Sequence, residues 1–342
     1  MSRRWALCAQ RFGIAFGVAV SVAEIAHAQG ISPTCTVTPT AAGSAADVCR
    51  KASDLFAFVV PQVGVALAGG NHVLGEGGTL GGWGKRTVTL RVTAVDGRLP
   101  KNTVPLTLSR SAAVADDFGA DRVPVPMPSL DAAIGLLAGL PMGVTNVGGV
   151  DVLLGVIGSS AISSGKFGLK PQGSRVALSY GVRVGALQES SFVPGLSVSW
   201  VRRKVPTLDL DYTPANDTLL VRNMSLTANT LRIVASKRFV LFGVAAGVGR
   251  DEIQGVSGLQ AVVNEAVLGT PTRATITFPT LKETVRRNTA FVNASFGVPL
   301  ARLVAEYGRS SAGTLRETLN AFGGRRANET YAYGSVGVTV RF

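Results

Sequence analysis

Charged and aromatic residues are scarce in this chain of 342 residues: 16% are Asp, Glu, Lys or Arg, and 6% are Phe, Trp or Tyr. With 46% hydrophobic residues and a mean hydropathy of +0.30, the chain is too apolar for a disordered protein or a typical soluble enzyme. After residue 28, however, Gly, Thr, Ser or Arg interrupts every apolar stretch before it reaches the roughly 18 residues of a membrane-spanning helix. The composition is therefore that of a membrane protein, while the pattern excludes helical spans beyond residue 28.

The first 28 residues have the features of a secretory signal peptide. Arg3 and Arg4 precede a mostly apolar stretch over residues 12–22, and residues 26–28 (Ala-His-Ala) form a small-x-small cleavage pattern. Charged residues interrupt the apolar part, so a permanent N-terminal membrane helix is the less favoured alternative. We expect an exported protein that is cleaved after this segment.

Cysteine and histidine are also scarce, with 3 Cys and 2 His in the whole chain. After cleavage only Cys35, Cys49 and His72 would remain. An exported chain with two cysteines favours one disulfide, and a Cys35–Cys49 bond would close a loop of about 15 residues and stabilise the fold by about 3 kcal/mol. A zinc site needs four N or S ligands, so we expect neither a metal nor another cofactor.

Most of the chain alternates between apolar and small or polar residues. Successive side chains of a strand point to opposite faces, so such segments are strands with one apolar face. A soluble β-sandwich also alternates, but its inner face carries bulky residues, whereas the second face here consists of Gly, Ser, Thr, Asn and Arg and suits a wet lumen. The pattern predicts an all-β fold, a transmembrane antiparallel β-barrel, with a secreted all-β protein as the alternative. The clearest segments are residues 87–95, 177–187, 195–200, 240–249 and 288–298.

The chain ends on an aromatic residue at the end of an alternating strand. Val336, Val338 and Val340 share the face of Phe342, and Tyr333 lies on the other face. With the signal peptide and the serial alternation, this ending resembles Gram-negative outer-membrane β-barrel proteins, whose last strand is read by the barrel-insertion machinery. The resemblance implies an outer-membrane location, contact with outer-membrane lipids and lipopolysaccharide, and recognition by that machinery through Tyr333 to Phe342.

Three parts follow along the chain: a signal peptide at 1–28, a disulfide-containing plug or cap at 29–82, and the barrel at 83–342. Within the second part, residues 51–60 could form a short helix that ends before Pro61. At roughly 20 residues per strand and connection, the barrel part gives about 12 strands, within a range of about 10 to 14.

A barrel of this size with an N-terminal plug is loosely similar to the long-chain fatty acid transporter family. The similarity rests on size, on the apolar N-terminal segment and on the Gly- and Asn-rich stretch near Asn71. No motif of that family transfers to particular residues. The similarity implies a fatty-acid-like solute.

Catalytic motifs are absent from the sequence. There is no Gly-x-Ser-x-Gly elbow, and residues 81–86 fail the phosphate-loop pattern at both ends. His72 precedes the first clear strand and is expected in a solvated loop. Asp209 and Asp211 share one strand face, where solvation is favoured over acid–base chemistry. We predict no catalytic residue and no enzymatic activity.

The excess of basic residues, 34 against 21 acidic ones, is the remaining functional signal. By strand parity, five arginines and one glutamate fall on the face away from lipid, and arginines that line a pore favour anions. The alternative is that these arginines pair with acids in loops or with lipid A phosphates. Their scatter along the strands argues against nucleic acid as a partner. The residues are Arg91, Arg183, Arg232, Arg302, Arg341 and Glu306.

Two functions remain. The first is a channel or transporter for small anionic or amphipathic solutes, and the second is a structural or interaction barrel without a conducting pore. Small residues on the lumen face favour the first, because a barrel that fills itself needs bulkier ones. Those residues include Gly181, Gly185, Gly243, Gly247 and Ser295.

Overall fold

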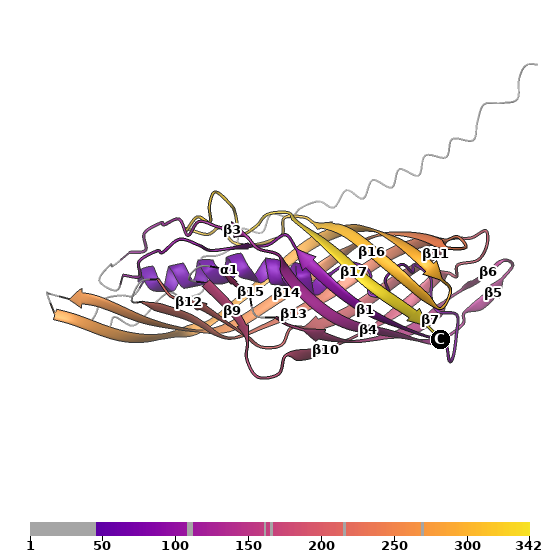
Figure 1. Ribbon diagram of the computed structural model, residues 1–342, viewed down its shortest axis with the longest axis horizontal. Helices are drawn as coiled ribbons and strands as arrows, with labels where there is room; N and C mark the ends of the chain where they lie inside the picture. The colour runs from indigo at the N-terminus through magenta and orange to yellow at the C-terminus, as the bar shows by residue number, and fades with distance from the viewer. Residues whose placement is uncertain (1–45, 108–111, 161, 165–166, 215–216, 268–269) are drawn as a thin grey trace, which may run out of the picture. The chain divides into compact units, whose positions relative to one another are not determined.

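The computed structural model describes residues 46–107, 112–160, 162–164, 167–214, 217–267 and 270–342 (Figure 1). The predicted signal peptide and Cys35 lie outside these residues. Cys49 is buried in the first turn of the helix, and its predicted disulfide with Cys35 stays a prediction.

Ten antiparallel strands form a closed ring, which confirms the predicted barrel. Each strand pairs with the next in the order β11-β10-β7-β4-β1-β17-β16-β15-β14-β13, and a β11–β13 pairing closes the ring. Closure leaves no free sheet edge in lipid, where unpaired backbone groups would be costly. The strands are β1 (Arg86–Val95), β4 (Val125–Leu137), β7 (Gly149–Gly158), β10 (Val176–Leu187), β11 (Gly195–Lys204), β13 (Thr218–Arg238), β14 (Phe242–Val267), β15 (Thr270–Val298), β16 (Ala301–Ser310) and β17 (Tyr331–Arg341).

The ring has fewer strands than the estimate of about 12, although it lies within the expected range. The difference comes from three long strands: β13, β14 and β15 contain 21, 26 and 29 residues. They extend past the ring, and β12 (Leu208–Tyr212), β9 (Phe167–Pro171) and β8 (Ile162–Ser164) continue the sheet beside β13 (Figure 1).

The two ends of the ring differ in their connections. At one end the chain turns tightly between β13 and β14 and between β15 and β16, and β17 ends there beside the start of β1. At the other end the connections from β1 to β4, β7 to β10, β11 to β13 and β16 to β17 are long, and we call it the long-connection end; β14 and β15, which are joined directly, extend beyond the ring on this side. Outer-membrane barrels have short periplasmic turns and longer outer loops, so we expect the short-turn end to face the periplasm and the long-connection end to be external. The small hairpin β5 (Leu140–Met142) and β6 (Thr145–Val147) lies between β4 and β7, and β2 (Arg98–Leu99) pairs with β3 (Asp121–Arg122) between β1 and β4.

An apolar band covers the outside of the ring. On β14 the outward residues Phe242, Val244 and Val248 are exposed, and the next outward residues, Arg250 and Glu252, are polar. The same change occurs on the neighbouring strand β15. The alternation predicted from the sequence is therefore confirmed, and the polar parts of the long strands extend beyond the apolar band on the external side.

Helix α1 (Ala46–Ala68) lies alongside the extended parts of β13, β14 and β15, and its C-terminal end reaches the ring (Figure 1). It packs against β13, β14, β1, β15, β4, β17 and β11. It is the only helix among the described residues that is long and apolar enough to cross a membrane, and it is buried throughout that span. The helix is longer than the predicted 51–60 and continues past Pro61. The proline removes one helical hydrogen bond, but wall contacts stabilise the helix on every side. The Gln62 side chain donates to the Phe58 carbonyl oxygen at 2.9 Å.

The Gly-rich residues 69–84 leave α1 and continue through the lumen to β1 at the short-turn end. We call residues 46–84 the plug. Glycines of the wall make room for it: a β-carbon at Gly255 would lie 2.8 Å from a methyl carbon of Val60, and one at Gly337 would lie 2.9 Å from a methyl carbon of Leu74.

Some of the small lumen residues that were expected to leave a passage face the plug instead. A β-carbon at Gly185 would lie 3.0 Å from Thr79, and one at Gly75 would lie 3.4 Å from the Ser295 β-carbon. At these two wall positions the space is filled by the plug, whereas a β-carbon at Gly181, Gly243 or Gly247 would meet other wall residues.

This fit predicts a cost for adding one methyl group to the wall. Gly255→Ala should lower the free energy of unfolding by about 1–3 kcal/mol, since the new carbon overlaps Val60. Gly258→Ala on the same strand is the matched control, because the nearest atom to its β-carbon is 3.6 Å away. Urea unfolding followed by heat-modified electrophoretic mobility measures both, and equal midpoints for the two variants would contradict the tight fit.

Candidate functional site

The C-terminal end of α1 is bound by arginines of the barrel wall. The last carbonyl groups of a helix lack intrahelical partners and carry partial negative charge. Arg203 donates to the carbonyl oxygen of the last helical residue. Arg232 Nη2 donates to the Gly69 carbonyl oxygen at 2.8 Å, and Arg91 Nη1 donates to the Asn71 carbonyl oxygen at 2.7 Å. Three guanidinium groups from β1, β11 and β13 therefore cap one helix end.

Glu306 on β16 binds the same turn of the plug through its amide groups. Its carboxylate oxygens accept hydrogen bonds from the backbone N–H groups of Gly70 at 3.1 Å and Asn71 at 2.9 Å. The Asn293 side chain donates to the same carboxylate at 2.7 Å. A β-carbon at Gly70 would overlap the Glu306 carboxylate, so a larger residue here would displace that carboxylate.

Three wall arginines also have a carboxylate partner on the neighbouring strand. Both partners of each pair are buried, and a buried charge without a partner is costly. The charges of these three arginines are therefore balanced by carboxylates of the wall itself. The pairs are Arg91–Asp131 at 2.7 Å, Arg183–Asp151 at 2.7 Å and Arg232–Asp251 at 2.6 Å.

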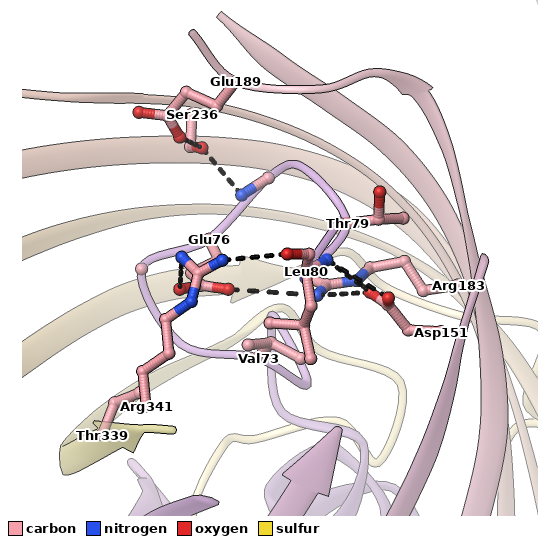
Figure 2. A network of polar contacts seen from close by, with 12 residues as sticks. Val73, Glu76, Thr79, Leu80, Asp151, Arg183, Glu189, Ser236, Thr339 and Arg341 are labelled. Carbon is pink, nitrogen blue, oxygen red and sulfur yellow. Dashed lines mark hydrogen bonds and ion pairs between the residues drawn. The ribbon is translucent and has the colours of Figure 1, made fainter. Parts of the chain in front are cut away.

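Further polar contacts bind the plug near the short-turn end (Figure 2). The Leu80 amide donates to both oxygens of Asp151 at 3.2 Å, and Asp151 is also the partner of Arg183. Arg341 on the last strand donates to the Leu80 carbonyl oxygen at 3.0 Å and lies 3.6 Å from Glu76. The plug backbone is thus bonded to strands on different sides of the ring.

A third set of contacts binds α1 at the long-connection end. Arg316, between β16 and β17, donates to Asp54 Oδ1 at 2.8 Å and to Ser53 Oγ at 2.6 Å, and it also bonds Glu283 at 2.8 Å. Burial lowers the pKa of Arg316, but the hydrogen bonds to Asp54 and Glu283 outweigh it, and the pKa is raised. Asp54 also accepts bonds from the Leu319 amide and from Asn320.

Lys51 makes a neighbouring contact one turn earlier on α1. Its ammonium group lies 2.6 Å from Asp47 and 2.8 Å from Asp116, and it donates to the Pro105 carbonyl oxygen at 2.7 Å. The helix therefore enters the ring among the long connections and runs toward the short-turn end.

Five of the residues predicted to line the lumen belong to these contacts, namely Arg91, Arg183, Arg232, Arg341 and Glu306. Arg341 is partly exposed, whereas Arg302 is half-buried near the short-turn end and has no ion pair among the described residues. The structure thus brings the predicted arginines to the lumen side, where most of them contact the plug.

His72 does not lie in a solvated loop. It is buried in the lumen, with Nδ1 at 3.0 Å from Arg203 Nη2 and 3.7 Å from Asp131. Asp209 of β12 pairs with Arg222 at 2.8 Å. Among the residues that the structure describes, no group of three His, Cys, Asp or Glu could hold a metal ion.

The sequence reasoning missed Arg203, Arg287 and the acids of the wall. Arg203 continues the parity of Ser197 and Ser199, so extending that strand by three residues would have found it. Arg287, beside the Tyr331 ring at 4.9 Å, shares the parity of the β15 lumen residues. The wall acids are Asp131, Asp151 and Asp251. Asp131 and Asp151 lie on strands that the pattern did not identify. Asp251 continues the parity of the 240–249 segment, so extending that strand by two residues would have found it.

The C-terminal strand places its predicted insertion residues on both faces. Val336, Val338 and Phe342 are exposed on the outside, and Val340 is half-buried there. Tyr333 is buried toward the lumen. Their recognition by the insertion machinery stays a prediction.

Removal of the Glu306 charge should loosen the plug. Glu306→Gln weakens the bonds to two plug amides and should lower the free energy of unfolding by about 2 kcal/mol. Glu252→Gln is the matched control, because Glu252 pairs with exposed Arg286 outside the lumen and should cost about 0.5 kcal/mol. Urea unfolding measures both, and equal losses would show that the lumen bonds do not stabilise the plug.

The Arg316–Asp54 contact should stabilise the outer end of α1. Arg316→Ala leaves Asp54 buried without its main cation, so the free energy of unfolding should fall by about 3 kcal/mol. Hydrogen exchange should rise first in the N-terminal turns of α1, whereas Arg325→Ala, which breaks an exposed pair with Glu329, should leave that exchange unchanged. Unaltered exchange in Arg316→Ala would contradict this anchoring role.

No family model matches the chain, and no curated protein matches it. Among solved structures, the chain is similar to the translocator domain of autotransporter NalP from Neisseria meningitidis, with 12% identity over 76% of this chain and 89% of that one and a TM-score of 0.37. It is also similar to the COG4313 outer membrane channel from Pseudomonas putida F1, with 8% identity, coverage of 75% and 94%, and a TM-score of 0.28. The anion-selective porin from Comamonas acidovorans matches at 8% identity, coverage of 75% and 98%, and a TM-score of 0.18. The chain itself has the architecture of an outer-membrane β-barrel with an internal plug.

Proposed function

We propose that the protein is a gated outer-membrane channel that its own plug closes at rest, and that it admits small solutes only when the plug is displaced. The observation that carries this proposal is the bonding of wall arginines to the plug backbone. Arg203 donates to the last carbonyl oxygen of α1, and Arg91 and Arg232 donate to carbonyl oxygens of the turn that follows it. While those bonds exist, the guanidinium groups are not available to a solute.

The chemistry of the wall favours anions once the plug is displaced. Four buried acids face the lumen, at Asp131, Asp151, Asp251 and Glu306. The arginines on the same face outnumber them, so the emptied lumen would be net positive and would attract anionic solutes such as carboxylates. These arginines are Arg91, Arg183, Arg203, Arg232, Arg287, Arg302 and Arg341.

The second candidate function is a structural barrel that never conducts. It is favoured by the three separate sets of contacts that bind the plug, at Asp54, at Glu306 and at Leu80. A plug bonded at both ends and in the middle needs several contacts to break together before a passage opens.

The remaining features belong to the same proposal. Residues 1–28 direct export and are removed, and the last strand directs insertion into the outer membrane. The mature protein then contacts outer-membrane lipids and lipopolysaccharide, carries a Cys35–Cys49 disulfide, and has no enzymatic activity.

Single-channel current in planar bilayers tests the gate. The wild-type protein should be silent, or nearly so, whereas the double variant Glu306→Gln, Arg316→Ala should give frequent current steps, because two of its plug anchors are removed. The reversal potential in a KCl gradient should show anion selectivity. Glu252→Gln, which alters only an exposed pair, should behave as the wild type does.

Each other result decides between the candidates. Steady current in the wild type would contradict a closed resting state. Silence of the double variant, with its fold intact by heat-modified mobility, would favour the structural barrel. Cation selectivity of the open variant would contradict the role of the lumen arginines.

A further inference from the structure

A groove crosses the lipid-facing side of β13, β14, β15 and β16, which lie side by side in Figure 1. Its volume of about 560 Å³ lies in the range of small-molecule pockets. The floor consists of outward alanines, Ala235, Ala246 and Ala290, where neighbouring positions carry larger side chains. Ala235 pairs directly with Ala246, and the walls include Ile233 and Tyr307. The groove is thus apolar, and a single hydrocarbon chain can fill it.

Two arginines lie at the external rim of this groove. Arg309 pairs with Ala290, and Arg250 pairs with Asn288, two residues further toward the long-connection end. Both side chains are exposed. Since they are on strands β14 and β16, with only β15 between them and an offset of two residues along the strands, their backbones are roughly 12 Å apart.

These two arginines differ from the other basic residues nearby. Across the described ranges of the chain, neither Arg250 nor Arg309 has an ion pair or a side-chain hydrogen bond. Arg286, at a similar height on β15, is instead bonded to Glu252 at 2.9 Å. Two guanidinium groups above an apolar groove are therefore available for an external anion.

The position of these two arginines along the barrel axis indicates the level of the bilayer at which a bound anion lies. From the short-turn end upward, the outward residues of β14 are apolar up to Val248, and Arg250 is the first charged one. With the short-turn end on the periplasmic side, as the connection lengths lead us to expect, Arg250 and Arg309 lie at the headgroup level of the outer leaflet, and the groove lies directly below them.

We propose that the groove and these two arginines form a binding site for a phosphate-bearing acyl glycolipid of the outer leaflet, namely lipid A. One acyl chain lies on the floor formed by Ala235, Ala246 and Ala290, and Tyr307 packs along it. A phosphate group binds Arg250 and Arg309, whose planar guanidinium groups suit bidentate contact with phosphate. This site is separate from the lumen and does not depend on the plug.

Binding of dye-labelled lipid A to the purified full-length protein in mild detergent, followed by fluorescence anisotropy, tests the site. The double variant Arg250→Gln, Arg309→Gln should bind about tenfold more weakly than the wild type. Ala290→Phe should fill the floor and weaken binding by a similar factor without altering charge. Dephosphorylated lipid A should bind the wild type and the double variant equally.

Arg175→Gln is the matched control, because Arg175 is also exposed at the long-connection end but precedes β10, away from the groove. An equal loss in this variant would mean that only net charge matters, and it would overturn the site. Unchanged binding in both the double variant and Ala290→Phe would overturn it as well. If a second copy of the chain occupied the groove, Ala290→Phe would dissociate a dimer while lipid A affinity stayed the same, which also contradicts the proposal. Heat-modified mobility confirms that every variant is folded.

Discussion

The structure depends on one requirement, that a helix ending inside a barrel must find partners for its last carbonyl groups. Water is largely excluded there, so an unbonded carbonyl or an unpaired charge would be costly. Arg203, Arg232 and Arg91 supply the donors, and Glu306 accepts the amides of the following turn. Because those donors are charged, they in turn need carboxylates, which the neighbouring strands provide as Asp131 and Asp251.

This requirement couples the wall to the plug. The buried wall arginines need the plug carbonyls and the wall acids as partners. The backbone of the Gly-rich segment in turn needs the wall side chains to satisfy its hydrogen bonds. The same coupling explains the glycines: Gly70 admits the Glu306 carboxylate, and Gly255 admits Val60. Small side chains in the lumen of a barrel therefore do not by themselves indicate an open pore, since they can equally mark the path of an internal segment.

Strand parity was the part of the site that the sequence could predict. Arg91, Arg183, Arg232 and Glu306 face the lumen because side-chain direction alternates along a strand whatever the partner is. What they bind could not be predicted, because contacts such as Glu306 with Gly70 join residues 236 positions apart. The wall acids were missed for a related reason: Asp131 is on a strand with prolines and alanines whose alternation is weak in the sequence, although its burial pattern in the barrel is regular.

The fold class, the direction of the wall side chains and the apolar face of the last strand follow from local periodicity and burial, so they could be predicted from the sequence. The strand number, the length of α1 and the contents of the lumen depend on tertiary contacts. Strand number depends on how far β13, β14 and β15 extend past the ring, and α1 continues beyond Pro61 only because the wall packs around it. Closure of the ring brings the plug into contact with wall charges that are distant in the sequence, and no local sequence pattern predicts those contacts.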